Sequence, residues 1–271
     1  MGNKEQNSPE IDSLINTDRL DDHLASLRYA EIIQRALMPD PELLKSVFSD
    51  HFVLFLPRDI VSGDFYYVLR NSSFLCVAAG DCTGHGVPGA LLSILGISFL
   101  NDILQLRSDM KANRVLNMMR EKIMKALHQT GDKAETKDSI DIGLVIIDCN
   151  TGAIQFSGAN RPLIRVRNGE IAEFKPDKMT IGLDPLKEHP FTNQQIDSLP
   201  GDTFYLFSDG YSDQFGELTD KTFKHKHLKA VISSVAGLPL INQKEILEST
   251  FHEWKGNTQQ IDDILVLGFQ L

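Results

Sequence analysis

The sequence predicts an α+β protein in which helices cover antiparallel β-sheets. Helical patterns come in pairs, and strand patterns come as hairpins joined by short polar turns. Strands and helices do not alternate regularly, as they would around a parallel sheet. The length of 271 residues allows one large domain with an appendage, and a content of 42% hydrophobic and 24% charged residues is typical of a globular chain.

The N-terminal region is expected to divide into two parts. Residues 1–16 are polar and are expected to be disordered. Residues 17–48 are expected to form a linker or regulatory segment, built on a helix over residues 18–38 with Thr17 or Asp18 as its cap and Pro39 as its end. The stripe that predicts this helix consists of Leu20, Leu24, Leu27, Ala30, Ile33 and Leu37. Such a stripe either packs on its own domain or belongs to a dimerising or signal-relaying helix.

The rest of the chain, residues 49–271, is expected to form the main domain. Apolar runs between turn residues predict its strands, and Asn168-Gly169 is the strongest hairpin signal among the turns. The expected strands cover residues 52–56, 65–69, 74–79, 140–148, 153–157, 163–167, 170–174, 203–208 and 264–269. The expected helices cover residues 88–106, 113–129, 225–235 and 243–254. The apolar stretch 87–106 is interpreted as a buried helix rather than a membrane span, because polar residues and two glycines interrupt it.

Charge and cysteine content exclude several classes of function. A formal charge of −10 argues against binding to nucleic acid or to an anionic membrane surface. Three cysteines, none of them at CxxC spacing, predict reduced thiols and a cytoplasmic location. An acidic chain can still act on phosphorylated substrates when bound cations reverse the sign of the local field.

Four short segments place an aspartate beside a turn at the end of an apolar run. They contain Asp64, Asp81, Asp209 and the pair Asp262 and Asp263. Converging carboxylates repel one another, and divalent cations that prefer oxygen ligands, such as Mg²⁺ and Mn²⁺, relieve this repulsion. Two such ions side by side bind a phosphate and activate water for in-line attack. Each segment alone is more simply a turn, so only their combination indicates a metal site.

Four sequence segments together resemble a known family: IVSGDFYYV, FLCVAAGDCTGHGVPGALLS, GDTFYLFSDGYSDQ and IDDILVLGF. They resemble the metal-dependent PPM (PP2C-like) protein phosphatases, specifically the SpoIIE-like bacterial branch, over roughly residues 51–271 and in the family's order. The N-terminal SLRYAEIIQRALMP is similar to a helix that often joins this domain to a sensor module. The resemblance implies a four-layer α-β-β-α sandwich of two antiparallel sheets flanked by helices, with metals in a cleft at one end.

The resemblance also implies the ligands of two Mn²⁺ or Mg²⁺ ions. Asp81 matches the aspartate that bridges both ions, and the backbone carbonyl of Cys82 would complete the second ion's site. Asp64 matches a carboxylate of that second site, acting partly through water. Asp209 and Asp262 match ligands of the first ion, and Asp81 and Asp209 are the expected catalytic residues. A water that bridges the ions would attack the phosphorus, with no covalent phosphoenzyme.

Four further residues are weaker candidates. Asp263 follows the expected ligand of the Asp-Asp pair and is expected to support it. Asp141 lies where some relatives hold a third, weaker ion, although it could simply face solvent. His85 stands four residues past Asp81 rather than two, so the general-acid role of the eukaryotic histidine is not transferred, and shaping of the turn is favoured. Arg58 could replace the family's phosphate-binding arginine, although a solvated strand-end charge is the favoured interpretation.

The expected function is hydrolysis of phosphoserine or phosphothreonine on a regulatory protein. The bacterial branch implies a STAS-type anti-anti-sigma factor in a partner-switching pathway as the substrate. It also implies an upstream sensor or activator that acts through the N-terminal helix, and it leaves a homodimer open. Two alternatives remain: a non-catalytic phosphoprotein-binding module on the same fold, and a two-metal hydrolase of small phosphoesters. The presence of all the expected carboxylates favours an enzyme.

Overall fold

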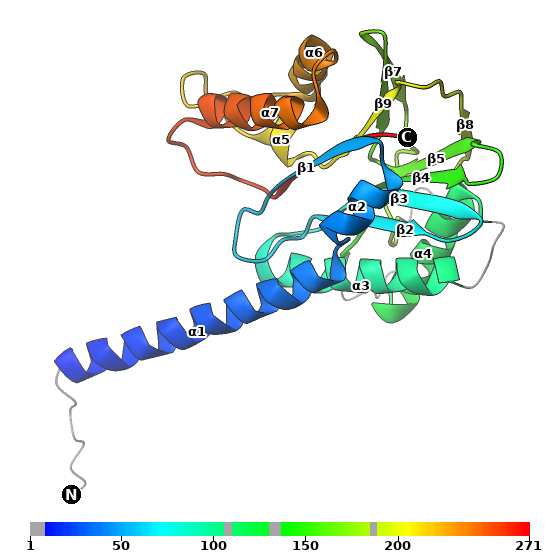
Figure 1. Ribbon diagram of the computed structural model, residues 1–271. Coiled ribbons are helices and arrows are strands. Elements are labelled where there is room, and N and C mark those ends of the chain that lie inside the picture. The colour runs from blue at the N-terminus through cyan, green and yellow to red at the C-terminus, as the bar shows by residue number, and fades with distance from the viewer. Residues whose placement is uncertain (1–8, 106–109, 130–136, 185–188) are drawn as a thin grey trace, which may run out of the picture.

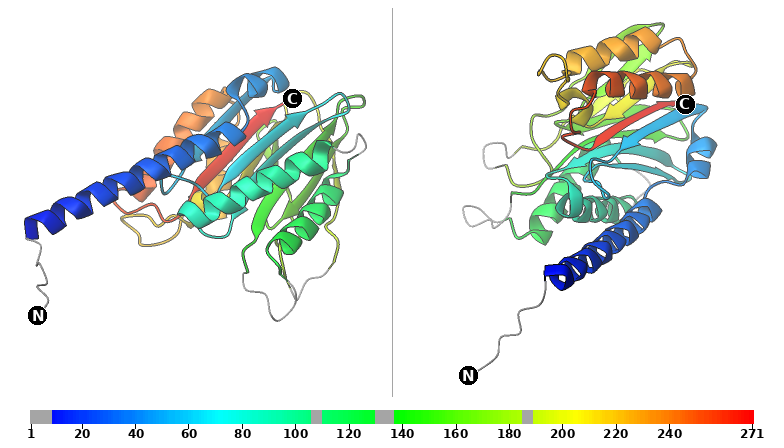
Figure 2. Two further views of the ribbon diagram at one scale, coloured as in Figure 1. Left: turned by 90° about the horizontal axis from the view of Figure 1, so that it is seen from below. Right: turned by 90° about the vertical axis from the view of Figure 1, so that its left-hand side faces the viewer.

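The computed structural model describes residues 9–105, 110–129, 137–184 and 189–271. In this part of the chain, two five-stranded antiparallel sheets stack face to face between layers of helices (Figures 1 and 2). The four-layer sandwich implied by the sequence is therefore confirmed.

The two sheets draw their strands from distant parts of the chain. The first sheet runs β1 (Asp50–Leu56), β10 (Ile264–Gln270), β9 (Thr203–Phe207), β6 (Leu163–Arg167) and β7 (Glu170–Phe174). The second runs β2 (Phe65–Arg70), β3 (Phe74–Cys82), β4 (Ile140–Asp148), β5 (Ile154–Ala159) and β8 (Gln194–Ile196). Every neighbouring pair of these strands is antiparallel. The strand order places β10 inside the first sheet, between β1 and β9.

The helices form two outer layers. They are α1 (Pro9–Leu37), α2 (Pro41–Val47), α3 (Gly86–Gln105), α4 (Ala112–Ala126), α5 (Gly210–Asp213), α6 (His225–Val235) and α7 (Leu240–Lys255). Helices α3 and α4 cover the second sheet, and α6 and α7 cover the first (Figure 2). Most of α1 extends away from the body, and its C-terminal end lies against α3 (Figures 1 and 2).

Three apolar cores hold the four layers together. The strands alternate their side chains between two faces, so each sheet contributes to the middle core and to one outer core. Residues from both sheets, such as Val77, Leu206 and Phe269, fill the middle core. Phe65 and Leu100 pack between the second sheet and its helices. The outer core under α6 and α7 is rich in aromatic side chains: Phe52, Tyr205, Phe207, Tyr211, Phe223 and Phe251.

The N-terminal helix is longer than the sequence pattern indicated. It begins at Pro9, so residues 9–16 are helical rather than disordered, and Thr17 and Asp18 lie inside the helix rather than at its cap. Proline is well tolerated in a first helical turn, and the sequence that follows has neither glycine nor proline until Pro39. Residues 1–8 lie outside the described residues.

Three short elements were not predicted: α2, β8 and α5. Strand β8 has three residues, two of them glutamine, and α5 has four residues. Such short elements carry no periodic apolar signal of their own, because their position depends on neighbours that are distant in the sequence. Helix α2 has a local signal that was overlooked, since Asp40 caps it by accepting a hydrogen bond from the Glu42 N–H, with Pro41 in the first turn.

Helix α3 is the one helix, among the described residues, that is long and apolar enough to cross a membrane. Half of its most apolar window is buried inside the protein. Its buried positions include Gly89, Ser93 and Gly96, which bring the helix close to the second sheet. This packing agrees with the interpretation of the stretch as a buried core helix.

Candidate metal centre

A polar cleft of about 210 Å³ lies where strand ends from both sheets meet. Its described lining consists of Asp81, Cys82, Thr83, Gly84, Ser139, Asp141, Arg161, Asp209 and Asp262. The second sheet supplies Asp81 and Asp141, which face each other in the register of β3 and β4. Asp209 follows β9 and Asp262 precedes β10, so the first sheet supplies the other two carboxylates. Four aspartates from distant parts of the sequence therefore share one cleft.

Arg161 holds three of these carboxylates together. Its Nη2 lies 2.8 Å from Asp81 Oδ2, 3.4 Å from Asp141 Oδ2 and 2.5 Å from Asp209 Oδ2. The preceding Asn160 has a φ of 55° and donates a hydrogen bond of 2.9 Å to Asp141. The sequence analysis did not identify Arg161, because a single arginine in a turn after a strand has no distinctive pattern. Its position shows that the cleft concentrates negative charge at one point.

Asp64 lies beneath the cleft and is almost completely buried, with a relative exposure of 1%. Burial raises the pKa of its carboxyl well above the ordinary value, and the negative charge of Asp81 adds to this rise. Ser208 opposes the rise by donating a hydrogen bond of 2.6 Å to Asp64 Oδ2, and the Leu265 N–H in turn donates to the Ser208 hydroxyl. A nearby cation would stabilise the ionised form of a carboxylate in this environment.

Burial and neighbouring charges also act on the pKa of Asp81. Burial raises its pKa well above the ordinary value, Arg161 opposes this rise, and the charge of Asp209 adds to it. Cys82 follows it in β3 with a buried side chain that packs in the core under α3 and α4. Burial also raises the pKa of the Cys82 thiol, which disfavours the thiolate form.

The two neighbouring aspartates of the C-terminal motif have different surroundings. Asp262 lines the cleft. Asp263 is buried, and its two carboxylate oxygens accept hydrogen bonds of 2.7 Å from the backbone N–H groups of Arg58 and Gly63. Asp263 therefore fixes the loop that leads into Asp64.

His85 and Arg58 are not among the residues that line the cleft. His85 Nδ1 lies 2.8 Å from Asp59 Oδ2, and this contact ties the turn before α3 to the loop after β1. The Arg58 guanidinium donates a hydrogen bond of 3.0 Å to the Ile261 carbonyl on the exposed surface. His85 therefore makes a contact within the turn region, and Arg58 makes a backbone contact at the surface.

A buried glutamine links the N-terminal helix to the loop before Asp64. Gln34 of α1 donates hydrogen bonds of 2.6 Å to the Ser62 carbonyl and 2.8 Å to Ser93 Oγ of α3, and it accepts one from the Ser62 N–H. Its relative exposure is 2%. The sequence analysis did not identify it, because a glutamine on an amphipathic helix normally faces solvent.

The donor groups of the cleft suit hard divalent cations. Among the residues that the structure describes, no three His, Cys, Asp or Glu side chains already form a compact ligand cluster, and Arg161 stands between the carboxylates. The available donors are nevertheless all oxygens, which Mg²⁺ and Mn²⁺ prefer. One guanidinium nitrogen in contact with three carboxylates shows that positive charge is stabilised here. The residues present therefore fit such ions.

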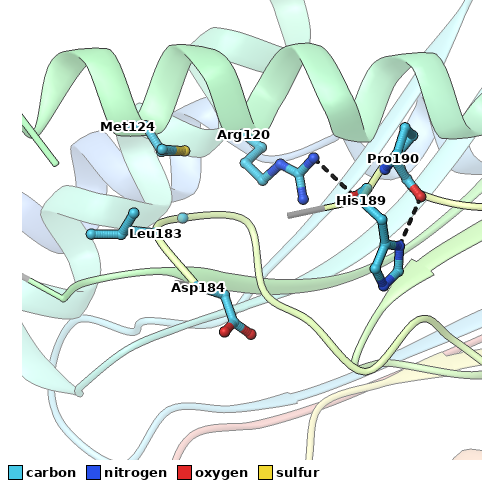
Figure 3. Close-up of a pocket in the computed structure, with 7 residues that line it drawn as sticks. Arg120, Met124, Leu183, Asp184, His189 and Pro190 are labelled. Atoms are coloured by element: carbon cyan, nitrogen blue, oxygen red, sulfur yellow. Dashed lines mark hydrogen bonds between the residues drawn. The ribbon is translucent and has the colours of Figure 1, made fainter. Parts of the chain in front are cut away.

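A larger cavity of about 410 Å³ lies between α4 and residues 182–184 and 189–190 (Figure 3). It shares no lining residue with the carboxylate cleft. The guanidinium of its Arg120 donates a hydrogen bond of 3.0 Å to the His189 carbonyl and lies 5.0 Å from the centre of the Phe191 ring. Arg120 therefore holds His189 and Phe191 against α4.

Comparison with known proteins identifies the fold and the family. A sequence model of the family described as Stage II sporulation protein E (SpoIIE) matches residues 72–271. The solved SiaA-PP2C domain of Pseudomonas aeruginosa is 30% identical, with a TM-score of 0.83 over 93% of this chain and 98% of that one. No curated protein sequence matches the chain.

Two more distant structures share the fold. The PP2C phosphatase domain of SpoIIE from Bacillus subtilis, solved with a fragment of its regulatory domain, is 18% identical with a TM-score of 0.66, over 82% of this chain and 63% of that one. The PPM Ser-Thr phosphatase MsPP from Mycobacterium smegmatis is 16% identical with a TM-score of 0.56, over 83% of this chain and 99% of that one. The family match and the shared fold agree, and the chain belongs to the SpoIIE family of PP2C-type phosphatases.

Proposed function

We propose that the chain is a metal-dependent protein serine/threonine phosphatase. The observation that carries this proposal is the convergence of Asp81, Asp141, Asp209 and Asp262 from four separate segments on one small cleft. Membership of the SpoIIE family and the likeness to the SiaA-PP2C domain support the same activity.

Asp81, the Cys82 carbonyl, Asp209 and Asp262 would hold two Mn²⁺ or Mg²⁺ ions, with Asp64 beneath them acting partly through water. Asp141 is a candidate ligand for a third, weaker ion. The bound ions would supply the Lewis acidity that activates water and neutralises the phosphate charge during in-line displacement.

The protein's own residues prepare this chemistry in three ways. Ser208 orients Asp64 through its hydrogen bond of 2.6 Å. Asp263 fixes the loop before Asp64 through two backbone N–H groups. Arg161 balances the charge of three carboxylates, and it must change its contacts when ions enter between them.

The lining of the cleft favours a phosphoprotein over a nucleotide. Its described lining residues include no aromatic side chain on which a base could stack. We propose a phosphorylated regulatory protein as the substrate, of the STAS type used in partner switching, acting in the cytoplasm.

We further propose that residues 17–48 regulate the domain formed by residues 49–271. Helix α1 exposes several apolar side chains, including Tyr29 and Ile32, so an upstream sensor or a second copy has a surface to bind. The Gln34 contacts give that helix a direct connection to the loop before Asp64. Deleting residues 1–38 is expected to change activity or oligomeric state. If neither changes, α1 has no regulatory role and only packs against the domain.

The test is hydrolysis of p-nitrophenyl phosphate and of a phosphothreonine peptide in the presence of Mn²⁺, Mg²⁺ or EDTA. We expect turnover that needs the metal and that Asp81→Asn and Asp209→Asn each abolish. Asp220→Asn is the matched control, because Asp220 is an exposed turn residue with a φ of 50° that asparagine also adopts.

Calorimetric titration with Mn²⁺ separates the outcomes. No turnover from a folded protein that still binds Mn²⁺ would indicate a missing activator. A folded protein with neither turnover nor metal binding would refute the proposed activity and favour a non-catalytic phosphoprotein-binding module.

A further inference from the structure

An apolar groove adjoins the polar cleft. It has a volume of about 270 Å³ and is lined by Pro88, Leu91, Leu92, Leu95, Leu127 and Asp138. Leu91 is 65% exposed, and Val87 beside the groove is 47% exposed. A leucine-lined hollow that is open to solvent is typical of a surface that binds a partner.

The groove and the cleft are separated by a single ridge of backbone. Asp138 borders the groove, and the next residue, Ser139, lines the cleft. Consecutive Cα atoms lie only about 3.8 Å apart. The Thr83 N–H donates a hydrogen bond of 2.9 Å to the Ser139 carbonyl, which joins the ridge to the turn that follows Asp81. A peptide with its phosphate in the cleft therefore has the groove within reach on the other side of this ridge.

The walls of the groove are held in place by buried contacts. The side chain of Gln129, with a relative exposure of 1%, donates a hydrogen bond of 2.7 Å to the Asp138 carbonyl. It also accepts a hydrogen bond of 2.9 Å from the Leu183 N–H. These bonds fix the chain just after Leu127 against the ridge. The groove is thus pre-formed rather than a gap between loose side chains.

We propose that this groove binds an apolar side chain of the phosphoprotein substrate, from the segment that flanks the phosphorylated serine or threonine. The inference rests on the proposed phosphatase function. The polar cleft offers a protein substrate little apolar contact, whereas five of the six described residues that line the groove are apolar. An extended chain advances about 3.3 Å per residue, so a side chain close in sequence to the phosphorylated residue reaches the groove.

A peptide series tests the proposal. Short phosphothreonine peptides carry one leucine, placed in turn at each flanking position in a background of serine and glycine, and kcat/KM is measured with Mn²⁺. We expect leucine at one or two adjacent positions to raise kcat/KM about tenfold over serine, which corresponds to about 1.4 kcal/mol.

Variants assign the preference to the groove. Leu91→Gln and, from the opposite wall, Leu127→Gln are each expected to remove the leucine preference. Ile241→Gln is the matched control, because Ile241 is 55% exposed on α7 in the other helix layer. It is expected to keep the preference. Circular dichroism confirms that each variant is folded.

Three outcomes would overturn the proposal. Equal turnover of all peptides by the unaltered protein removes the docking role and leaves the phosphatase activity intact. A folded protein that neither binds Mn²⁺ nor turns over any peptide or p-nitrophenyl phosphate refutes the proposed function together with the docking role. A dimer that Leu91→Gln converts to a monomer in light scattering, without any leucine preference, assigns the groove to a second copy of the chain.

Discussion

The two helix layers of the sandwich each bury a glutamine, and the two residues have different neighbours. Gln34, on the side of α3, bonds to the Ser62 backbone, two residues before Asp64. Gln243 of α7 accepts a hydrogen bond of 2.6 Å from the Tyr205 hydroxyl and donates one to the Leu238 carbonyl. Both side chains are almost fully buried. Gln34 thus connects the α3 side to the loop before Asp64, whereas Gln243 braces the helices that cover the first sheet.

The packing of the two layers differs in the same way. On the α3 side, a Cβ added at Gly89 would lie 2.4 Å from the Gly84 carbonyl oxygen and 2.9 Å from Gly63 Cα. The helix therefore touches the backbone of two loops of the site. On the α7 side, the contacts are made by aromatic rings, such as Tyr211 with Phe251 at a centroid distance of 5.4 Å. Small residues transmit a displacement of the backbone, whereas large rings mainly contribute stability.

The substitution with the largest predicted cost lies in the aromatic core under α6 and α7. Phe251→Ala removes a fully buried ring and is expected to lower the free energy of unfolding by about 3–5 kcal/mol. The affinity of the folded protein for Mn²⁺ is expected to stay unchanged. Chemical denaturation and calorimetric titration measure the two quantities, and a parallel loss of Mn²⁺ affinity would mean that both layers control the site.

The second substitution lies in α3, where the helix contacts the loops of the site. Gly89→Val places atoms against the backbone at Gly84 and Gly63, and it is expected to cost about 1–3 kcal/mol of stability. Because those loops carry the candidate ligands, we also expect a clear loss of Mn²⁺ affinity and of turnover. Gly237→Val is the control, since a Cβ there meets no atom within 4 Å. Unchanged Mn²⁺ binding by Gly89→Val would contradict the connection.

Substitution of the two buried glutamines, Gln34 and Gln243, compares the two sides of the molecule directly. Gln34→Ala and Gln243→Ala each leave buried polar groups without partners, so each is expected to cost about 1–3 kcal/mol of stability. Only Gln34→Ala is expected to weaken Mn²⁺ binding. The measurement is the Mn²⁺ dissociation constant at a temperature where both variants are folded, and equal dissociation constants would show that α1 does not influence the site.

The smallest effect concerns the surface of the same helix. Arg35 forms an exposed ion pair of 2.9 Å with Glu31, one helical turn earlier. Arg35→Ala is expected to change stability by less than about 0.5 kcal/mol, because exposed pairs contribute little. No change in kcat is expected. A strong loss of activity would mean that the exposed face of α1, rather than Gln34, links this helix to the site.

The sequence predicted the hairpins and the four acidic segments well, because their signals are local. Alternating apolar runs and turn residues mark the strands, and aspartates at strand ends mark places where the chain leaves the sheet. The partners of these aspartates could not be predicted in the same way. Arg161, Ser208 and Gln34 meet their acidic or backbone partners only through tertiary packing, across sequence separations of 20 to 144 residues.

The position of β10 has a consequence for how the molecule assembles. Asp262, which enters this inner strand, is separated from Asp64 by 198 residues, and β10 pairs with both β1 and β9. Pairings between such distant segments carry a large loop-closure cost and slow the folding of a domain. A partly folded chain that has not yet inserted β10 therefore lacks one wall of the cleft. The cleft is therefore complete only in chains whose first sheet has formed, because Asp262 reaches it only when β10 is in place.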